Sequence, residues 1–369
     1  MPSSERTAWK RARSRSTKGA KGQLFVPIQQ RSTTFYALDD DGEPVDGFNR
    51  LFRSVRSNEE GYLEVRRYLD GKEYAILMEN STKTHDVVWT MEGLGMEVLV
   101  AHSPDLKKIT KSDKKTDEND ARDLAMYLLA RLSGADQFNL SYMCSKEDMM
   151  ARQLCRAAKQ EMVDRGKIKR RMRSHALLYG IDIDRLDPTT ASGRKRLLEL
   201  DDPVLDNLVR SMEDNLSRQK ALEERLADMF SGNRTFEKID AIPFFGLITS
   251  AYLTSYIGDI SRFKDSKAFV ASLGLAPRER NSGEKTSHCG ITKKGDPHAR
   301  WLLIQATIGH VRGCESSPVT RFFNRKNGGS LSERGEAELT PVMNRQAIVA
   351  AAAKMATIIY TLVVKDRDW

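Results

Sequence analysis

The sequence is poor in the features that mark several classes of protein. It has only four cysteines in 369 residues and no C-x-x-C pair, which argues against a zinc ribbon or a redox motif and favours a reduced, cytoplasmic compartment. The longest apolar stretch we find, 241–257, is interrupted by Pro243 and Gly246, so it predicts a buried helix and no membrane span. No apolar core of a signal peptide follows the first 21 residues.

Positive charge is in excess. The chain has 60 Lys and Arg against 51 Asp and Glu, a net charge of +9 and a pI near 9.3, which favours polyanionic partners such as DNA or RNA. Charge alone leaves open a basic enzyme with no nucleic-acid role. Residues 1–22 form a basic tail that we expect to be disordered, and that either contacts phosphates or only aids solubility.

Residues 23–140 show the alternating pattern of an α/β domain. An initial strand meander followed by alternating helices and strands indicates a mixed sheet covered by helices. We predict strands at 24–29, 33–38 and 47–53, a helix that opens at Ser57, a buried strand at 74–78, a helix at 84–94, a buried strand at 96–101 and a helix at 120–132.

The rest of the chain is predicted to be helical, so the fold class is α/β plus α. Helices at 145–179 and 203–230 indicate a helical hairpin or coiled coil within residues 141–232. Residues 233–369 form a mostly helical C-terminal domain with a Gly- and Lys-rich loop at 278–297. Its predicted core includes Tyr252, Tyr256, Trp301, Leu302 and Leu303.

Three carboxylates are candidate metal ligands. Glu79 follows the buried strand at 74–78, and Asp117 and Asp120 are three residues apart, which puts them on one helix face. Carboxylates on a strand end and a facing helix can converge on Mg²⁺, which activates water or a hydroxyl for phosphoryl transfer. The alternative is ordinary helix-start chemistry, with Thr116 as the N-cap and the acids in the first turn.

A serine in the Gly- and Lys-rich loop is a candidate nucleophile. Ser282 precedes a glycine, and a serine hydroxyl needs a base, a metal or a cationic neighbourhood to attack phosphorus. The alternative is a loop that only binds phosphate or is simply solvated. His288 and His298 lie near the serine as possible proton shuttles or as polar surface. The cations that flank the serine and would hold a phosphate are Arg278, Arg280, Lys285, Lys293 and Lys294.

A second basic segment lies in the first long helix. The run from Arg165 to Arg173 holds six cations in nine residues and no acid. It is either a nucleic-acid contact or a solvated face. The candidate phosphate contacts outside the serine loop are Lys115, Arg165, Lys169, Arg170 and Arg171.

Three motifs occur together in one order, and they carry a resemblance. The stretch from Ile76 to Ile109 is similar to a strand-Glu, helix, strand, P-x-x-x-K sequence. "KKTDENDARDLA" matches K-T-D-x-x-D-A, and "GLAPRERNSGEKTSHCGITKKGDPHAR" matches GLAP…S-G…G-I-T-K-x-G-x-x-x-x-R. Over about 25–364 the chain resembles the insertion-sequence one-ten transposase family, which includes the Piv-type DNA invertases and the bridge-RNA-guided recombinases.

The resemblance implies a transposase or site-specific DNA recombinase. It implies a RuvC-like, RNase-H-type domain at 23–140 whose D-E-D-D acids bind Mg²⁺, with Glu79, Asp117 and Asp120 matching the second, third and fourth acids. It implies that Ser282 is the recombinase nucleophile and that the coiled coil serves homo-oligomerisation. The implied partners are DNA and a noncoding bridge RNA.

Two positions depart from the family pattern. Gln29 stands where the first acid is expected, and it brings an oxygen ligand but no charge. Phe244-Phe245-Gly246 stands where a Gly-x-Gly turn is usual. The first departure keeps open a repurposed nucleic-acid-binding protein without catalysis. A metal-dependent nuclease of the junction-resolving type is a third reading, against which Ser282 within its full signature argues.

Overall fold

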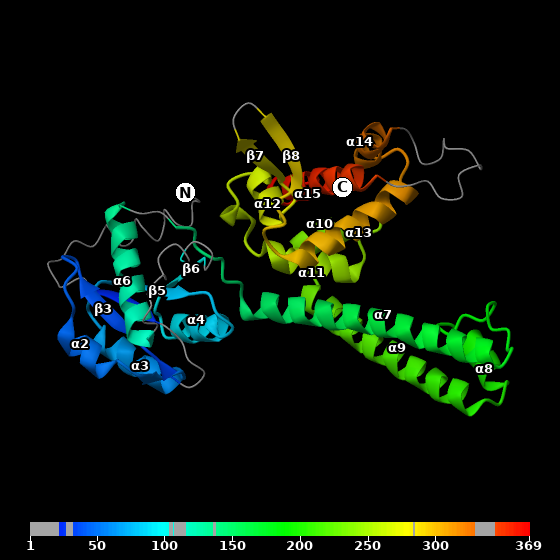
Figure 1. Cartoon of the computed structure of the whole chain (residues 1–369), viewed down its shortest axis with the longest axis horizontal. Helices are drawn as coiled ribbons and strands as arrows, with labels where there is room; N and C mark the ends of the chain where they lie inside the picture. The colour runs from blue at the N-terminus through cyan, green and yellow to red at the C-terminus, as the bar shows by residue number, and fades with distance from the viewer. Residues whose placement is uncertain are drawn as a thin grey trace. The chain divides into compact units, whose positions relative to one another are not determined.

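The computed structural model describes residues 22–26, 32–102, 106, 116–135, 138–282, 285–328 and 344–369, with side chains given outside 22–26 and 279–289. The chain divides into two compact units (Figure 1), one within residues 5–146 and one within residues 147–369. Each unit is described by itself.

The N-terminal unit is built on a mixed sheet, as the sequence predicts. The strand order is β3-β1-β5-β6, where β1 is Gly22–Val26, β3 is Tyr36–Asp39, β5 is Tyr74–Glu79 and β6 is Val98–Ala101. β3 is antiparallel to β1, whereas β5 is parallel to both β1 and β6. A separate two-stranded sheet pairs β2, Ser32–Thr33, with β4, Val55–Arg56.

Helices cover both faces of this sheet because β5 is apolar on both faces. Ile76 and Met78 pack into one core with α3, Glu59–Tyr68, and α4, Thr84–Gly93. Leu77 points to the other face. There it packs with α6, Asp117–Ser133, through Ala121, Leu124 and Leu128. The predicted helices and buried strands of 57–132 are thus confirmed.

The strand predicted at 47–53 is wrong. The chain forms a helix there, α2, Asp46–Leu51. Phe48 and Phe52 are four residues apart and both buried, with ring centroids 4.7 Å apart. A spacing of four places both rings on one side of a helical turn, whereas a strand would also put residues two apart on that face.

Two long antiparallel helices form the predicted hairpin. They are α7, Lys146–Leu178, and α9, Pro203–Phe230, and the boundaries of α9 agree with the prediction. A short helix between them, α8, Ala191–Leu198, was not predicted because its segment is polar. Leu197 of α8 packs in the distal core of the hairpin beside Met172 and Leu208.

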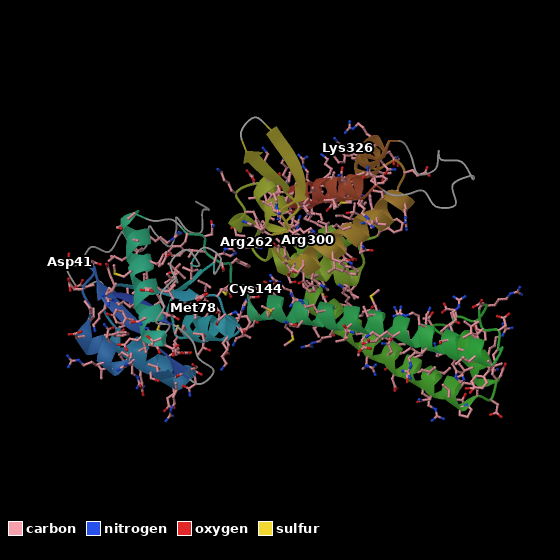
Figure 2. All side chains as sticks on the ribbon, in the orientation of Figure 1. Asp41, Met78, Cys144, Arg262, Arg300 and Lys326 are labelled. Atoms are coloured by element: carbon pink, nitrogen blue, oxygen red, sulfur yellow. The ribbon has the colours of Figure 1, made fainter. Side chains whose placement is uncertain are left out.

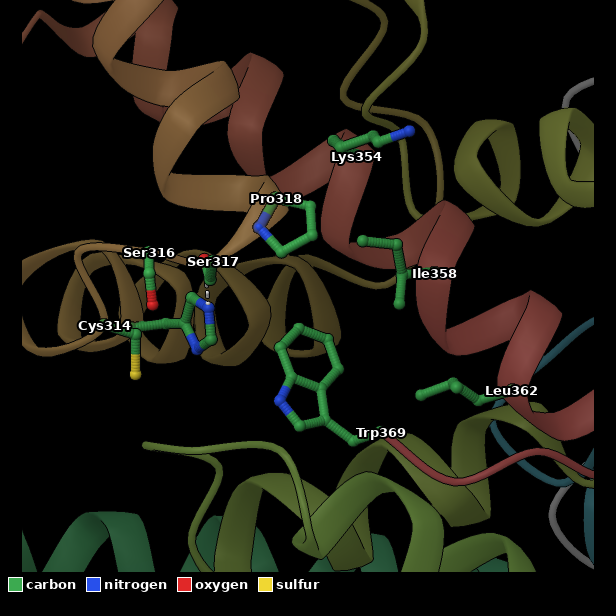
Figure 3. Close-up of a pocket in the computed structure, with 9 residues that line it drawn as sticks. Cys314, Ser316, Ser317, Pro318, Lys354, Ile358, Leu362 and Trp369 are labelled. Atoms are coloured by element: carbon green, nitrogen blue, oxygen red, sulfur yellow. Dashed lines mark hydrogen bonds between the residues drawn. The ribbon is translucent and has the colours of Figure 1, made fainter.

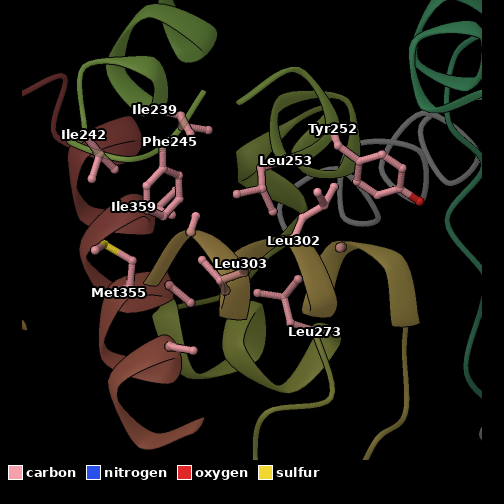
Figure 4. Packing of buried hydrophobic residues seen from close by; sticks show 14 of the residues in the cluster. Ile239, Ile242, Phe245, Tyr252, Leu253, Leu273, Leu302, Leu303, Met355 and Ile359 are labelled. Carbon is pink, nitrogen blue, oxygen red and sulfur yellow. The ribbon is translucent and has the colours of Figure 1, made fainter. Parts of the chain in front are cut away.

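The C-terminal helices enclose the largest core of the chain (Figure 4), which includes Tyr252, Leu302 and Leu303 as predicted. Ala151 and Cys155 of α7 and Leu226 of α9 belong to this core. The base of the hairpin is therefore part of the C-terminal unit. The helices of this region are α10, Arg234–Asp240; α11, Leu247–Ile257; η1, Ile260–Arg262; α12, Ser266–Ser272; α13, Pro297–Gly313; α14, Pro318–Asn327; and α15, Arg345–Val364.

One helix of the described residues, α15, is long and apolar enough to cross a membrane by length and composition alone. The sequence prediction that no segment reaches this length overlooked it. Ala351, Ala352, Met355 and Ile359 of α15 are buried in the C-terminal core. A central core helix passes the same test of length and composition, so α15 is weak support for a membrane span.

The loop predicted at 278–297 is largely a β-hairpin. β7, Pro277–Ser282, pairs in antiparallel fashion with β8, Lys285–Ile291. Within the described part of the chain, each strand has only the other as its partner in the sheet. Such a two-stranded ribbon need not bury an apolar face, so its sequence carries no apolar alternation, and the pattern predicts a loop instead of two strands.

Candidate active site

The β7–β8 hairpin fixes the backbone position of Ser282. This residue is the last of β7 and is paired with Lys285, the first of β8, so it lies at the end of the ladder. The strands stand out from the helices of their unit (Figure 1). Arg280 pairs with Ser287 two positions further back. The serine and Lys285 are therefore together at one end of the hairpin, as the basic-loop hypothesis requires.

The opposite end, the root of the hairpin, is closed by two backbone hydrogen bonds beyond the strands. Thr292 N donates to Ala276 O at 2.9 Å, and Lys293 N donates to Gly274 O at 3.1 Å. Gly274 has a φ of +70°, and a Cβ there would lie 2.2 Å from the carbonyl oxygen of Lys294. The glycine of the GLAP motif thus lets the two chain segments cross closely.

The Arg of the signature holds this root from α13. Arg300 Nη1 (Figure 2) donates to Leu273 O at 3.0 Å and to Lys293 O at 3.4 Å. Gly295 has a φ of +107°, and a Cβ there would lie 1.8 Å from Ser272 O. The G-x-x-x-x-R spacing of the signature therefore has a structural explanation, because its glycine and arginine both act at the root.

A polar network ties the root to the helical hairpin. Asp296 caps α13 by accepting from His298 N at 2.7 Å and Ala299 N at 3.2 Å. Tyr252 donates to its other oxygen at 2.6 Å, and Arg156 Nη2 of α7 donates to the Tyr252 hydroxyl at 3.0 Å. Burial tends to raise the pKa of Asp296, but these hydrogen bonds and the Arg156 charge hold it below its ordinary value.

The environment of Tyr252 disfavours the deprotonated hydroxyl that a nucleophile needs. Burial and then the hydrogen bond to Asp296 raise the pKa of its hydroxyl. Tyr256 has a raised pKa mainly because it is buried, and its hydroxyl donates to Ser272 O at 2.8 Å. Both tyrosines are buried, as predicted, and both support the hairpin root.

The three predicted carboxylates lie at one edge of the N-terminal sheet. Glu79 is the last residue of β5, so it lies at the edge where the parallel strands β1 and β5 end. Leu129, late in α6, lies against Gly42 in the turn after β3, at the opposite edge. The first turn of α6, with Asp117 and Asp120, is therefore at the same edge as Glu79.

As far as the structure describes this edge, its acids are not gathered into a metal site. Within the described residues, no group of three or more His, Cys, Asp or Glu side chains is arranged to hold a metal ion. Glu79 is exposed, and Asp117 and Asp120 are half-buried. Thr116 Oγ1 accepts from Asn119 N at 3.3 Å, which confirms the N-cap. Gln29 and Lys115 lie outside the described residues, so the ligand set stays a prediction.

Most cations of the Arg165–Arg173 run are paired within the helical hairpin of α7 and α9. Arg165 donates to Gln219 at 2.6 Å, and Lys169 lies 2.9 Å from Asp187. The hydrogen bond from Lys169 lowers the pKa of Asp187 to about 2. Arg170 and Arg171 are exposed and make no ion pair with any residue that the structure describes. These two arginines are the members of the run available to phosphate.

His298 is half-buried, and Trp301 is more exposed than predicted. Burial and then Lys159 lower the pKa of His298 to about 4. Its Nε2 is buried and has no hydrogen-bond partner in the described part of the chain. Trp301, predicted in the core, is 40% exposed, whereas Leu302 and Leu303 are buried as predicted. The side chain of His288 lies outside the described residues.

The Phe244 turn is strained where the family pattern has glycine. Phe244 has a φ of +72°, and its ring is 57% exposed. A positive φ is unfavourable for an aromatic residue and easy for glycine. Phe245 is buried in the C-terminal core. The departure from Gly-x-Gly therefore keeps the left-handed backbone of the turn.

Sequence reasoning missed a pocket of about 650 Å³ lined by His310, Cys314, Ser317, Lys354 and Trp369, among others (Figure 3). His310 is fully buried, and its two ring nitrogens contact Pro243 O at 3.1 Å and Ser317 Oγ at 2.8 Å. Ser317 also caps α14 by accepting from Thr320 N at 3.0 Å. Both nitrogens are thus used to join the Phe244 turn to α14.

The sequence of the chain is similar to those of known transposases. A sequence model described as the Transposase IS116/IS110/IS902 family matches residues 237–323. The chain is 27% identical over 295 residues to the transposase for insertion sequence element IS1111A of Coxiella burnetii, a match that covers 76% of this chain and 75% of that one. It is 24% identical over 298 residues to the transposase for insertion sequence element IS1328 of Yersinia enterocolitica, with 78% and 83% covered. These matches confirm the resemblance drawn from the motifs: the chain is similar to the transposases of the IS116/IS110/IS902 family.

Proposed function

We propose that this protein is a transposase that cleaves and rejoins DNA through Ser282. The observation that carries the proposal is the placement of Ser282 at the end of a hairpin whose root is built from the signature residues Gly274, Gly295 and Arg300. A nucleophile must be held in place to react efficiently. A ribbon fixed at its root by hydrogen bonds offers that positioning.

The proposed reaction conserves the energy of the phosphodiester bond, because a bond between phosphorus and serine replaces the bond that is broken. Ser282 Oγ bonds to the scissile phosphorus, the bond from phosphorus to one sugar oxygen breaks, and the freed sugar oxygen takes up the proton of the serine hydroxyl. In the second step a sugar hydroxyl of the new partner strand attacks the phosphoserine, its oxygen bonds to phosphorus, and the released Ser282 Oγ takes up the proton. Lys285 is paired with Ser282 in the β7–β8 hairpin. It and the other cations of this β-hairpin supply positive charge for the phosphate oxygens.

Glu79, Asp117 and Asp120 are the residues that would hold Mg²⁺ in a RuvC-like domain. The mixed sheet and the shared edge of these acids support this part of the proposal. Their donor chemistry suits a hard cation. Bound Mg²⁺ would supply positive charge for phosphoryl transfer. Because the described acids do not form a group of three, we assign no reaction step to the metal.

DNA is the substrate in this proposal, and a bridge RNA is the proposed guide. Exposed Arg170 and Arg171 on α7 are available for backbone contacts with either nucleic acid. We also propose a homo-oligomer, because Leu177, Leu178 and Tyr179 at the end of α7 are 69% to 80% exposed. Clustered exposed apolar side chains are typical of protein contacts.

The test is the covalent adduct. Ser282→Ala is expected to abolish protein–DNA adducts and leave nucleic-acid binding nearly unchanged, because the substitution removes a hydroxyl and no positive charge. The assay uses the full chain, target DNA, RNA from the flanking sequence and Mg²⁺, with adducts resolved on a denaturing gel. Adducts or recombination at the normal level with Ser282→Ala would disprove the serine mechanism.

A second candidate is a nucleic-acid-binding protein that has lost catalysis, which Gln29 favours. Gln29→Asp separates the two. If the metal site is only weakened, this change is expected to raise cleavage or lower the Mg²⁺ needed for it. If the protein is repurposed, neither form forms adducts at any Mg²⁺ concentration, while both still bind nucleic acid. Strong cleavage by the natural protein that Gln29→Asp leaves unchanged would assign the first acid elsewhere.

A further inference from the structure

Three cations of α7 each lie over an aromatic ring of the C-terminal helices. Arg152 is over Tyr256 and Arg156 over Tyr252, with 5.7 and 5.9 Å to the ring centroids. Lys159, one turn further along, has its Nζ 3.7 Å from the Trp301 centroid. The spacing of four and three residues keeps all three on one face of the helix.

The third pair differs from the first two. Arg152 is held by a 2.6 Å hydrogen bond to Ser255 O, and Arg156 by its bond to Tyr252, and both of their rings are buried. Trp301 is 40% exposed, and Lys159 makes no hydrogen bond or ion pair with any residue the structure describes. The first two pairs join helices through buried rings, whereas the third consists of a partly exposed indole and a half-buried ammonium that has no other partner among the described residues.

The surface around Trp301 has no negative charge from its own helix or from the adjacent part of α7. Residues 149–160 of α7 contain Arg152, Arg156 and Lys159 and no acid, and α13 contains no Asp or Glu along its whole length. The nearby Asp296 is engaged by Tyr252 and by the start of α13. An anionic strand would therefore meet attraction here.

We propose that Trp301 and Lys159 form a binding site for unpaired DNA at the root of the serine hairpin. An unstacked base packs on the indole in place of the ammonium, and the displaced Lys159 pairs with a neighbouring phosphate. Aromatic side chains beside cations are how proteins bind single strands without reading sequence. The indole follows Arg300, which holds the root, so the site is in the same unit as Ser282.

The proposal rests on the proposed function for its location beside the nucleophile and on its own observations for binding. It predicts that Trp301→Ala weakens binding of a short single-stranded DNA of mixed sequence about 5- to 150-fold, the effect of losing one stacked base. Trp301→Phe is expected to keep most of the affinity, because a ring remains. Both variants are expected to bind duplex DNA of the same sequence with the affinity of the natural protein.

Trp369 is the matched control. It is also 40% exposed, but Asp366 and Asp368 precede it, so Trp369→Ala is expected to leave single-strand binding unchanged. Lys159→Met is expected to lower the affinity and to flatten its salt dependence by about one phosphate contact. Thermal melting of each variant, measured beside binding, identifies loss of folding.

The outcomes are distinct from those of the adduct test. Binding is measured in the Ser282→Ala background, so a failed serine mechanism leaves this result standing. Equal losses on single-stranded and duplex DNA, an unchanged affinity in a folded Trp301→Ala protein, or an effect confined to RNA of the same sequence would each overturn the proposal.

Discussion

Arg300 donates a hydrogen bond from its guanidinium to the carbonyl oxygen of Leu273, 3.0 Å away. Leu273 precedes β7, and the same nitrogen also reaches the carbonyl of Lys293, which follows β8, at 3.4 Å. One side chain of α13 therefore holds, at the root, the two chain segments that enter and leave the hairpin carrying Ser282. The signature arginine is thus explained by its support of the hairpin root.

Arg300→Lys is expected to lower adduct formation on the order of 10- to 100-fold while DNA binding changes little. Lysine keeps the charge, but its Nζ is one bond nearer the backbone than Nη1 of arginine, so it does not reach both carbonyl oxygens from the same position. Adduct yield and affinity are measured on the same DNA. Arg312→Lys, an exposed arginine on the same helix, is the control. A parallel loss of binding in Arg300→Lys would indicate a phosphate contact in place of hairpin support.

Gly295→Ala is expected to lower the free energy of unfolding by about 3 kcal/mol or more. A methyl group there lies 1.8 Å from Ser272 O, and the backbone has a φ of +107°. Gly290→Ala is the matched control, because Gly290 has a φ of +67° and no atom within 4 Å of the new Cβ. It is expected to cost only the backbone strain, about 1–2 kcal/mol. Denaturant unfolding compares the two, and equal costs would contradict the close approach.

The fold was predictable from the sequence where local signals agree. For α9, Asp202 caps the helix, Pro203 occupies its first turn, and Leu205, Leu208 and Met212 follow at helical spacing. For β5, apolar residues on both faces indicate a strand covered on both sides. These signals lie within a few residues of each other, so no knowledge of distant contacts is needed.

The failures depend on tertiary structure. Trp301 was assigned to the core with its neighbours, but which side of α13 is covered depends on where α7 lies. The hairpin at 277–291 pairs only with itself and has no apolar period to detect. The sequence placed Glu79 at a strand end and Asp117 and Asp120 on one helix face, but it does not give the distances that decide whether they share a metal.

His298 is expected to make stability depend on pH. Its pKa is lowered to about 4 by burial and by Lys159, from an ordinary value of 6.5. Between these values the unfolded chain binds the proton more readily than the folded one, so stability is present above pH 6.5 and is lost as pH falls towards 4. With allowance for solvent screening of a half-buried ring, the loss is up to about 2 kcal/mol.

The measurement is the free energy of unfolding from pH 7 to pH 4 for the natural chain and for His298→Gln. The variant, which does not titrate, is expected to lose this part of the pH dependence. His102→Gln, at an exposed histidine of the N-terminal unit, is the control. An identical pH profile for the natural chain and His298→Gln would show that the ring is protonated in the folded protein as easily as in the unfolded one.

Tyr252→Phe is expected to destabilise the C-terminal unit more than Tyr256→Phe does. Both hydroxyls are in hydrogen bonds, but Tyr252 donates to the Asp296 carboxylate at 2.6 Å, whereas Tyr256 donates to a neutral carbonyl at 2.8 Å. Hydrogen bonds to charged groups contribute about 1.5–3 kcal/mol, against about 0.5–1.5 kcal/mol for neutral pairs. A double-mutant cycle with Asp296→Asn measures the coupling, which we expect to exceed about 1 kcal/mol. Additive effects of Tyr252→Phe and Asp296→Asn would mean that the Tyr252 hydroxyl and the Asp296 carboxylate are not coupled, and the link from α7 through Tyr252 to the hairpin root would then have no energetic basis.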